Sequence, residues 1–114
     1  MRVIAVGECM VEFARRDDGL WQQGFAGDTL NVAWALAALL PGGARVDYMT
    51  RLGRDAFSER MVAFLDAAGI GTGMILREAG RSPGLYTIET DAAGERRFAY
   101  WRSASAARRL ADDP

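Results

Sequence analysis

The stretch RVDYMTRLGRDAFSERMVAFLDAAGIGTGMILR, residues 45–77, decides the fold class of this chain. It begins with a strand-like run at 45–50, continues with an amphipathic helix at 56–68 and ends in an apolar run at 74–77. Asp55 stands where a short carboxylate can cap the helix. A strand, a helix and a strand of these lengths predict a right-handed βαβ unit with parallel strands.

The residues before this unit predict one more core strand, a strand pair and a first helix. Residues 2–7 are a short apolar run stopped by glycine, which is typical of a buried parallel strand. Residues 10–15 and 20–25 are extended stretches on either side of a turn-forming sequence. The helix opens at 27–29, where Asp28 or Thr29 can cap it. Because this helix is apolar on nearly every side, we expect it to be buried on most sides.

The residues after the unit predict a hairpin, with strands at 84–90 and 96–102. A loop that pairs Asp91 with Glu95 places Tyr86 opposite Tyr100, and Arg102 then lies on the same face. The tail at 103–114 has a composition that could start another helix. Three parallel strands covered by two helices leave an unpaired sheet edge, so we expect the opening portion of a larger α/β domain and self-association through exposed edges.

Composition excludes several classes of protein and site. The chain has 114 residues, half of them apolar, and a net charge of −1, so neither nucleic acid nor a membrane is an expected partner. All 14 basic residues are arginine, and histidine is absent, which removes lysine nucleophiles and histidine bases or metal ligands. The lone Cys9 cannot form an internal disulfide, and we expect it to be a small buried side chain. No apolar run suggests a signal or a membrane span, so a cytoplasmic protein is expected.

The sequence GFAGDTLN, residues 24–31, is the first candidate binding site. A glycine before a helix lets a ligand approach backbone N–H groups, as Gly27 would here. Asp28 only accepts hydrogen bonds, whereas Asn31 both donates and accepts them. These three residues at one helix mouth fit a polyol or a sugar. The alternative is an ordinary turn followed by a helix cap.

The predicted hairpin carries the second candidate site. Tyr86, Tyr100 and Arg102 on one face would form a polar aromatic platform, on which an arginine can hold a carboxylate with two hydrogen bonds. The alternative is an exposed sheet face with a solvated arginine. Residues 51–55 are interpreted as a strand-to-helix turn, and structural roles are favoured for Glu8 and Glu12 over an acid–base pair.

Four separated parts of the sequence resemble the ribokinase/PfkB carbohydrate kinases. They are GECMVE at 7–12, AGDTLN at 26–31, RLGRDAF at 51–57, and GLY at 84–86 with FAYWR at 98–102. The last pair most resembles the 2-keto-3-deoxygluconate kinases within this family. The resemblance implies a ribokinase-like three-layer α/β/α core, with segments at about 2–7 and 27–77, and a small β lid over the sugar, with segments at about 10–25 and 84–102. One departure is Ala26, where the family usually shows a second glycine.

The resemblance also implies an activity: transfer of the ATP γ-phosphoryl group to a sugar hydroxyl, with Mg²⁺. By position, Gly27 and Asn31 would contact the sugar, Asp28 matches a frequent family position, and Arg102 would bind the carboxylate of a sugar acid from the lid beside Tyr86 and Tyr100. The family's catalytic aspartate lies in a Gly-Ala-Gly-Asp motif that these residues lack. We therefore expect an N-terminal portion that is inactive alone. The alternatives are another sugar kinase, such as a fructokinase or ribokinase, and a non-catalytic sugar-binding or dimerisation module.

Overall fold

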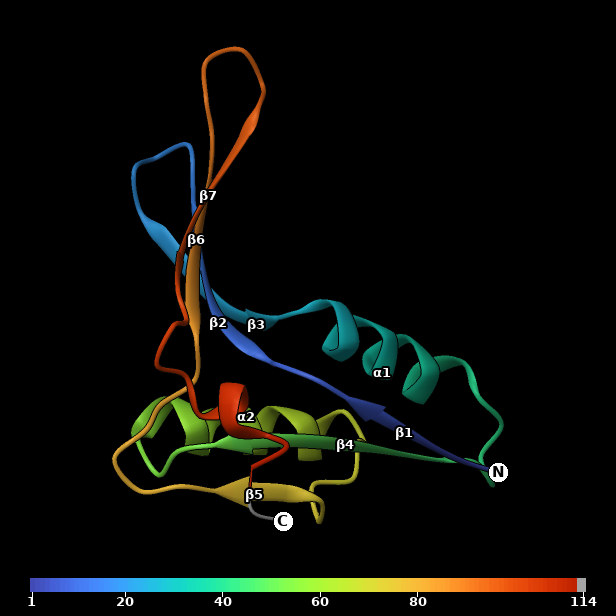
Figure 1. Ribbon diagram of the computed structural model, residues 1–114. Coiled ribbons are helices and arrows are strands. Elements are labelled where there is room, and N and C mark those ends of the chain that lie inside the picture. Colours follow the sequence, from blue (N-terminus) through green and yellow to red (C-terminus); the bar gives the residue numbers. More distant parts are fainter. Residues whose placement is uncertain (113–114) are drawn as a thin grey trace.

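Two sheets divide the chain between them in the computed structural model, which describes residues 1–112 (Figure 1). The first sheet is parallel, with strand order β1-β4-β5. The second is mixed, with order β3-β2-β6-β7, and is called the mixed sheet below. The strands are β1 (Arg2–Val6), β2 (Met10–Arg15), β3 (Trp21–Ala26), β4 (Arg45–Leu52), β5 (Ile75–Arg77), β6 (Leu85–Thr90) and β7 (Arg96–Trp101). The helices are α1 (Asp28–Leu39), α2 (Ala56–Ala67) and the 3₁₀ turn η1 (Ala106–Arg109).

The predicted βαβ unit is confirmed as β4-α2-β5. The Asp55 side chain caps α2 by accepting hydrogen bonds from the backbone N–H groups of Phe57 (3.1 Å) and Ser58 (3.2 Å). The Ser58 hydroxyl donates to the same carboxylate at 2.6 Å and accepts from the Gly53 N–H at 3.0 Å. Residues 51 and 52 of the predicted turn belong to β4, and the turn at 53–55 is closed by hydrogen bonds to the Asp55 and Ser58 side chains. A Cβ at Gly53 would lie 1.7 Å from the carbonyl oxygen of Arg81, so only glycine fits there.

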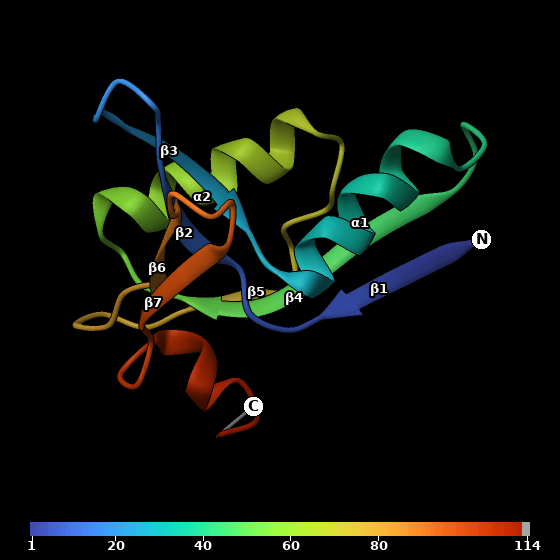
Figure 2. The same ribbon diagram turned by 90° about the horizontal axis from the view of Figure 1, so that it is seen from above.

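Two expectations for the first helix are wrong. The N-cap of α1 is Gly27, no side chain caps the helix, and Asp28 is already its first residue. The Thr29 hydroxyl is hydrogen-bonded to the Tyr48 hydroxyl at 2.7 Å instead, which anchors the helix to the parallel sheet. The helix is also less buried than expected, because only Leu30 and Ala33 are buried. It lies over β1 and β4 (Figure 2). Large apolar side chains on the rest of its surface are exposed, at Val32, Trp34 and Leu39.

Both helices cover the same face of the parallel sheet (Figure 1). Trp34 of α1 stacks on Phe64 of α2, with ring centroids 5.0 Å apart. The core between helices and strands includes the fully buried Tyr48, Met61 and Leu65. No helix in residues 1–112 has both the length and the apolar character needed to cross a membrane.

The predicted strand pair and hairpin are both confirmed in the mixed sheet. In the hairpin, the Asp91 N–H donates to the Glu95 carbonyl at 2.8 Å, and Gly94 has a φ of +83°. Tyr86 consequently pairs with Tyr100, as the loop geometry predicts. The sequence did not indicate that β2 and β6 pair in parallel and so join the two hairpins into one sheet. The tail forms only the short η1 turn, and residues 113–114 of the predicted tail helix lie outside the described residues.

Asp47 is a buried charge at the centre of the parallel sheet. It accepts hydrogen bonds from the guanidinium groups of Arg2 at 2.8 Å and Arg45 at 3.0 Å. A Cβ at Gly71 would lie 1.8 Å from Asp47 Oδ1, so the chain after α2 passes directly against this carboxylate. The hydrogen bond from Arg2, with further help from Arg45, lowers the pKa of Asp47 despite its burial.

We expect Asp47 to contribute stability that is lost in acid. Its lowered pKa means that the unfolded chain takes up the proton first, so the contribution is present above the ordinary aspartate pKa of about 3.9. It declines as the pH falls through that value toward the lower folded one. Urea unfolding of wild type and Asp47→Asn should therefore differ most at neutral pH and converge in acid. The exposed Asp17→Asn is the control, and a wild-type–Asp47→Asn difference independent of pH would contradict this account.

Candidate functional site

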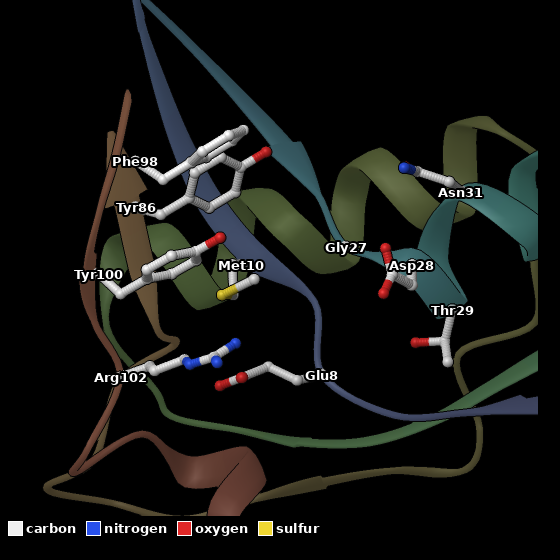
Figure 3. Close-up of a pocket in the computed structure, with 10 residues that line it drawn as sticks. All are labelled: Glu8, Met10, Gly27, Asp28, Thr29, Asn31, Tyr86, Phe98, Tyr100 and Arg102. Atoms are coloured by element: carbon white, nitrogen blue, oxygen red, sulfur yellow. The ribbon is translucent and has the colours of Figure 1, made fainter. Parts of the chain in front are cut away.

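One pocket of about 450 Å³ lies between the mixed sheet and the N-terminus of α1 (Figure 3). All six residues that the sequence singled out line it. Gly27, Asp28 and Asn31 form the helix side, and Tyr86, Tyr100 and Arg102 form the sheet side. Four other residues complete the lining: Glu8, Met10, Thr29 and Phe98.

Gly27 shapes the helix side of the pocket. Its φ of +153° is unfavourable for residues with a side chain, and a Cβ there would lie 2.6 Å from the Glu8 carbonyl oxygen. Ala26, by contrast, is an ordinary strand residue that pairs with Met10 at the end of β3. The positive φ of this turn falls on Gly27, so alanine at position 26 fits the turn without strain. The Asp28 and Asn31 side chains then point from the first turn of α1 into the pocket (Figure 3).

Aromatic rings form the sheet side. The Tyr86 and Tyr100 ring centroids are 5.8 Å apart, and Phe98 stacks on Tyr100 at 6.2 Å with nearly parallel planes. Tyr86 is only 8% exposed, whereas Phe98 and Tyr100 on the edge strand are about half exposed. The alternative of a fully exposed sheet face therefore holds for β7 but not for β6. Phe98 was missed, although its spacing of two residues from Tyr100 signals the same face of the strand.

The Arg102 guanidinium lies over the Tyr100 ring, 4.7 Å from its centroid. This cation–π contact orients the guanidinium without using any of its N–H donors. Within residues 1–112 its side chain makes no hydrogen bond or ion pair with another protein group. Arg102 thus presents a planar set of donors to the pocket, and such a set matches the two oxygens of a carboxylate.

Glu8 lies beside Arg102, although sequence reasoning favoured only a structural role for it. Its carboxylate accepts a hydrogen bond from the Ser105 hydroxyl at 2.7 Å, which ties the segment after β1 to the tail. The two side chains approach each other in the pocket (Figure 3). A Cβ at Gly84 would lie 2.8 Å from Arg102 Cβ and 2.9 Å from Glu8 Oε2. No motif in the sequence signals this, because it depends on how the mixed sheet meets β1.

Glu12 is the second residue whose place the sequence did not indicate. It lies opposite Tyr86 in the β2–β6 pair, and its carboxylate accepts a hydrogen bond from the Tyr86 hydroxyl. Burial, and next the contact with Glu12, raise the pKa of the Tyr86 hydroxyl. Tyr86 is therefore protonated throughout the neutral range and donates to Glu12.

These groups can bind a hydroxylated, anionic ligand but do not form a metal site. Donors from Arg102 and Tyr100 face acceptors from Asp28 and Asn31 across the pocket, an arrangement that suits a ligand with both hydroxyl and anionic groups. In residues 1–112, no group of three or more histidine, cysteine, aspartate or glutamate side chains could hold a metal ion. Burial raises the pKa of the Cys9 thiol to about 12, so it is no nucleophile at neutral pH.

Comparison with known proteins matches this arrangement to one family. The model of the pfkB family carbohydrate kinases matches residues 1–113. The chain belongs to the PfkB family of carbohydrate kinases. The 2-dehydro-3-deoxygluconokinase of Dickeya dadantii (strain 3937) is 43% identical over 113 residues, which are 98% of this chain and 36% of that protein. The chain thus spans about a third of the length of the curated relatives it matches.

Solved structures of PfkB kinases share the fold. The crystal structure of 2-dehydro-3-deoxygluconokinase from Thermotoga maritima superposes with a TM-score of 0.83 at 25% identity, covering 94% of this chain and 34% of that one. The fructokinase with bound ATP from Xylella fastidiosa gives 0.82 at 29% identity, covering 93% and 32%. The α/β class expected from the sequence is confirmed, as is the ribokinase-like architecture.

We expect Gly27→Ala to damage both the fold and the pocket. The new Cβ meets a backbone oxygen and the φ is strained, so the free energy of unfolding should fall by roughly 1–3 kcal/mol. Gly24→Ala is a matched control, because its Cβ would enter open space on the same strand pair. Urea unfolding measures the difference. Equal stability of the two variants would show that the Gly27 turn tolerates a side chain.

Proposed function

We propose that the whole gene product phosphorylates a sugar acid, 2-keto-3-deoxygluconate, and that these residues bind the sugar. This compound is also called 2-dehydro-3-deoxygluconate, the sugar acid in the name of the 2-dehydro-3-deoxygluconokinases that this chain resembles. The observation that carries the proposal is Arg102, whose guanidinium is oriented over Tyr100 with its donors free at one end of a pocket. A neutral sugar has no group that needs this arrangement. The reaction it belongs to is one of metabolism inside the cell, and we propose a cytoplasmic location.

The described residues do not provide a binding site for ATP or Mg²⁺. The described chain has no cluster of acidic side chains for a cation, and its sequence contains no Gly-Ala-Gly-Asp motif. We therefore propose that ATP and Mg²⁺, as cosubstrate and metal of the whole kinase, bind outside these 114 residues. The chain alone should then form no ADP from ATP and sugar.

The chain's own residues contribute binding and orientation. Arg102 and the Tyr100 hydroxyl would donate to the carboxylate, and Asp28 would accept from sugar hydroxyls. Asn31 can serve either group. Rigid placement matters, because holding the reacting hydroxyl in one geometry lowers the entropic part of the barrier. The glycine turn at Gly27 supplies this on the helix side, and the packed rings supply it on the sheet side.

Another PfkB sugar kinase is the second candidate, with fructokinase as its best-supported form. The favouring observation is that the ATP-bound fructokinase superposes as well as the deoxygluconokinase does. Fold similarity cannot separate the two substrates, whereas the charge of Arg102 can. A non-catalytic sugar-binding module uses the same pocket and differs by lacking phosphoryl transfer.

We also propose that the chain self-associates. β1 is an edge strand whose Ile4 and Val6 are exposed, and β7 is an edge strand that exposes Trp101. Light scattering at several concentrations should show species larger than the monomer. Ile4→Lys and Trp101→Lys tell the two surfaces apart, because only the one in contact should shift the distribution. A monomer at every concentration would contradict the proposal.

Arg102→Ala in the whole gene product should selectively impair phosphorylation of the sugar acid. A charge-assisted hydrogen bond is worth about 1.5–3 kcal/mol, so kcat/KM should fall roughly 10- to 150-fold. Tyr86→Phe removes one hydroxyl and should cost about 0.5–1.5 kcal/mol. Each variant is assayed with 2-keto-3-deoxygluconate and with a neutral analogue.

Arg97→Ala is the control, because Arg97 lies on β7, the strand that ends just before Arg102, is exposed, and pairs with Asp91 outside the pocket lining. If Arg102→Ala lowers kcat/KM equally for both substrates, or for neither, then Arg102 does not bind the carboxylate. A wild type that prefers neutral sugars would instead support the fructokinase-like alternative.

A further inference from the structure

The contact between Glu12 and Tyr86 determines which hydrogen bonds the pocket can offer. The Tyr86 hydroxyl has a single proton, and it donates this proton in a hydrogen bond to the carboxylate of Glu12. Because an ionised carboxylate has no proton to return, the phenol oxygen faces any other partner as an acceptor only. Tyr86 also lines the pocket, so this restriction applies to whatever binds there.

Tyr100 is the matched opposite case. It pairs with Tyr86 across the hairpin and lines the same pocket, but its hydroxyl has no hydrogen-bond partner within residues 1–112. It can donate or accept as the ligand requires. Two neighbouring tyrosines therefore present different chemistry, and Glu12 is the cause of the difference.

The remaining polar groups of the pocket differ in whether they can donate or accept hydrogen bonds. Arg102, beside Tyr100, can only donate hydrogen bonds. Glu8 at that end already accepts from Ser105. Asp28 on the helix side has no protein partner within the described residues and can only accept. The acceptor-only groups of the pocket are thus Asp28, Glu8 and, through Glu12, Tyr86, and of these Glu8 lies beside Arg102.

We propose that Glu12 is a positioning residue that holds Tyr86 as a hydrogen-bond acceptor, so that a sugar hydroxyl, and not a carbonyl or carboxylate oxygen, lies against Tyr86. The identity of the sugar rests on the proposed function. The carboxylate then lies at Tyr100 and Arg102, and the reversed orientation is disfavoured because it sets two acceptors against each other. Glu12 itself does not line the pocket and acts through the phenol.

The raised pKa of Tyr86 supports this assignment. The proton that Tyr86 shares in its hydrogen bond to Glu12 stays on the phenol across the neutral range, because burial and the carboxylate both oppose ionisation of the phenol. Register supports it independently. Glu12 and Tyr86 are direct neighbours in the parallel pair, so the contact is held by backbone pairing and not by side-chain choice alone.

A double-mutant cycle on the whole gene product tests the proposal. Glu12→Gln keeps the side-chain shape but offers both a donor and an acceptor, so the Tyr86 proton is no longer fixed. We expect KM for the sugar to rise roughly 3- to 10-fold with little change in kcat, the size of one neutral hydrogen bond. In a Tyr86→Phe background the same change should alter KM by less than about 2-fold, because the phenol through which Glu12 acts is gone.

Glu89→Gln is the control, since it also removes one carboxylate from the mixed sheet, but within residues 1–112 the Glu89 side chain forms its ion pair with Arg15 and does not line the pocket. It should leave both kinetic constants unchanged. Additive effects of Glu12→Gln and Tyr86→Phe would overturn the proposal, as would an unchanged KM in Glu12→Gln. If Glu12→Gln fails to fold, Glu12→Asp replaces it in the cycle, because the shorter acid keeps the charge and withdraws from the phenol.

A spectroscopic readout separates positioning from mere structural support. With Tyr48 and Tyr100 changed to phenylalanine, Tyr86 is the one remaining tyrosine of the 114 residues, and its ionisation is followed by ultraviolet absorbance. Glu12→Gln should lower the pH at which it ionises, and an unchanged titration would overturn the contact. If wild type phosphorylates only neutral sugars, the sugar-acid proposal fails, and the cycle is run with the sugar that is turned over.

Discussion

Parallel pairing between β2 and β6 is the interaction on which the rest of the structure depends. A single β-hairpin is marginal in water, and this chain has two, β2–β3 and β6–β7. They become one sheet only where Val11 to Ala14 pair with Leu85 to Ile88, about 70 residues further along the chain. Closing so long a loop costs conformational entropy. Burial of Val11 and Cys9 against the core of the parallel sheet offsets this cost.

The register of the β2–β6 pair determines which side chains form the sheet side of the pocket. Across the four strands, Gly24, Glu12, Tyr86 and Tyr100 form one row on a single face. Because side chains alternate along a strand, a slip of one residue between β2 and β6 would send Tyr86 and Glu12 to opposite faces. The hairpin alone would still pair Tyr86 with Tyr100. The acceptor character of Tyr86 needs both hairpins.

The sequence predicted what is local and missed what is distant. Helix α2 follows from its cap and stripe, and the Tyr86–Tyr100 pair follows from counting outward from a loop, since both depend on neighbours within about 15 residues. The roles of Glu8 and Glu12 depend on contacts with Ser105 and Tyr86 across more than 70 residues, for which a single sequence carries no period or spacing. The six candidate residues belong to two local motifs, the opening of α1 and the β6–β7 hairpin, and the fold places both motifs at one pocket.

The errors at α1 have a physical cause of their own. An apolar pattern shows which surfaces of a helix can be buried, but it does not show how many neighbouring elements cover them. Val32 and Leu39 are part of the apolar pattern of α1 and are nevertheless exposed. The cap prediction failed because the turn before α1 is set by a backbone contact. Gly27 is the N-cap, with a φ of +153°, and a Cβ there would lie 2.6 Å from the Glu8 carbonyl oxygen, so this position has no room for a capping side chain.

That contact also fixes how the two sheets meet. Glu8 lies in the segment that leads from β1 into β2, and Gly27 lies in the segment that leads from β3 into α1. The backbones of these two segments are in contact, with no room for a Cβ at Gly27. Asp28, one residue beyond, and the Glu8 side chain both line the pocket. The spacing between the helix side and the sheet side is therefore set by backbone packing, which is stiffer than side-chain packing. A ligand that spans from Asp28 to Arg102 bridges elements whose separation is already fixed, so little of its binding free energy is spent on ordering the site.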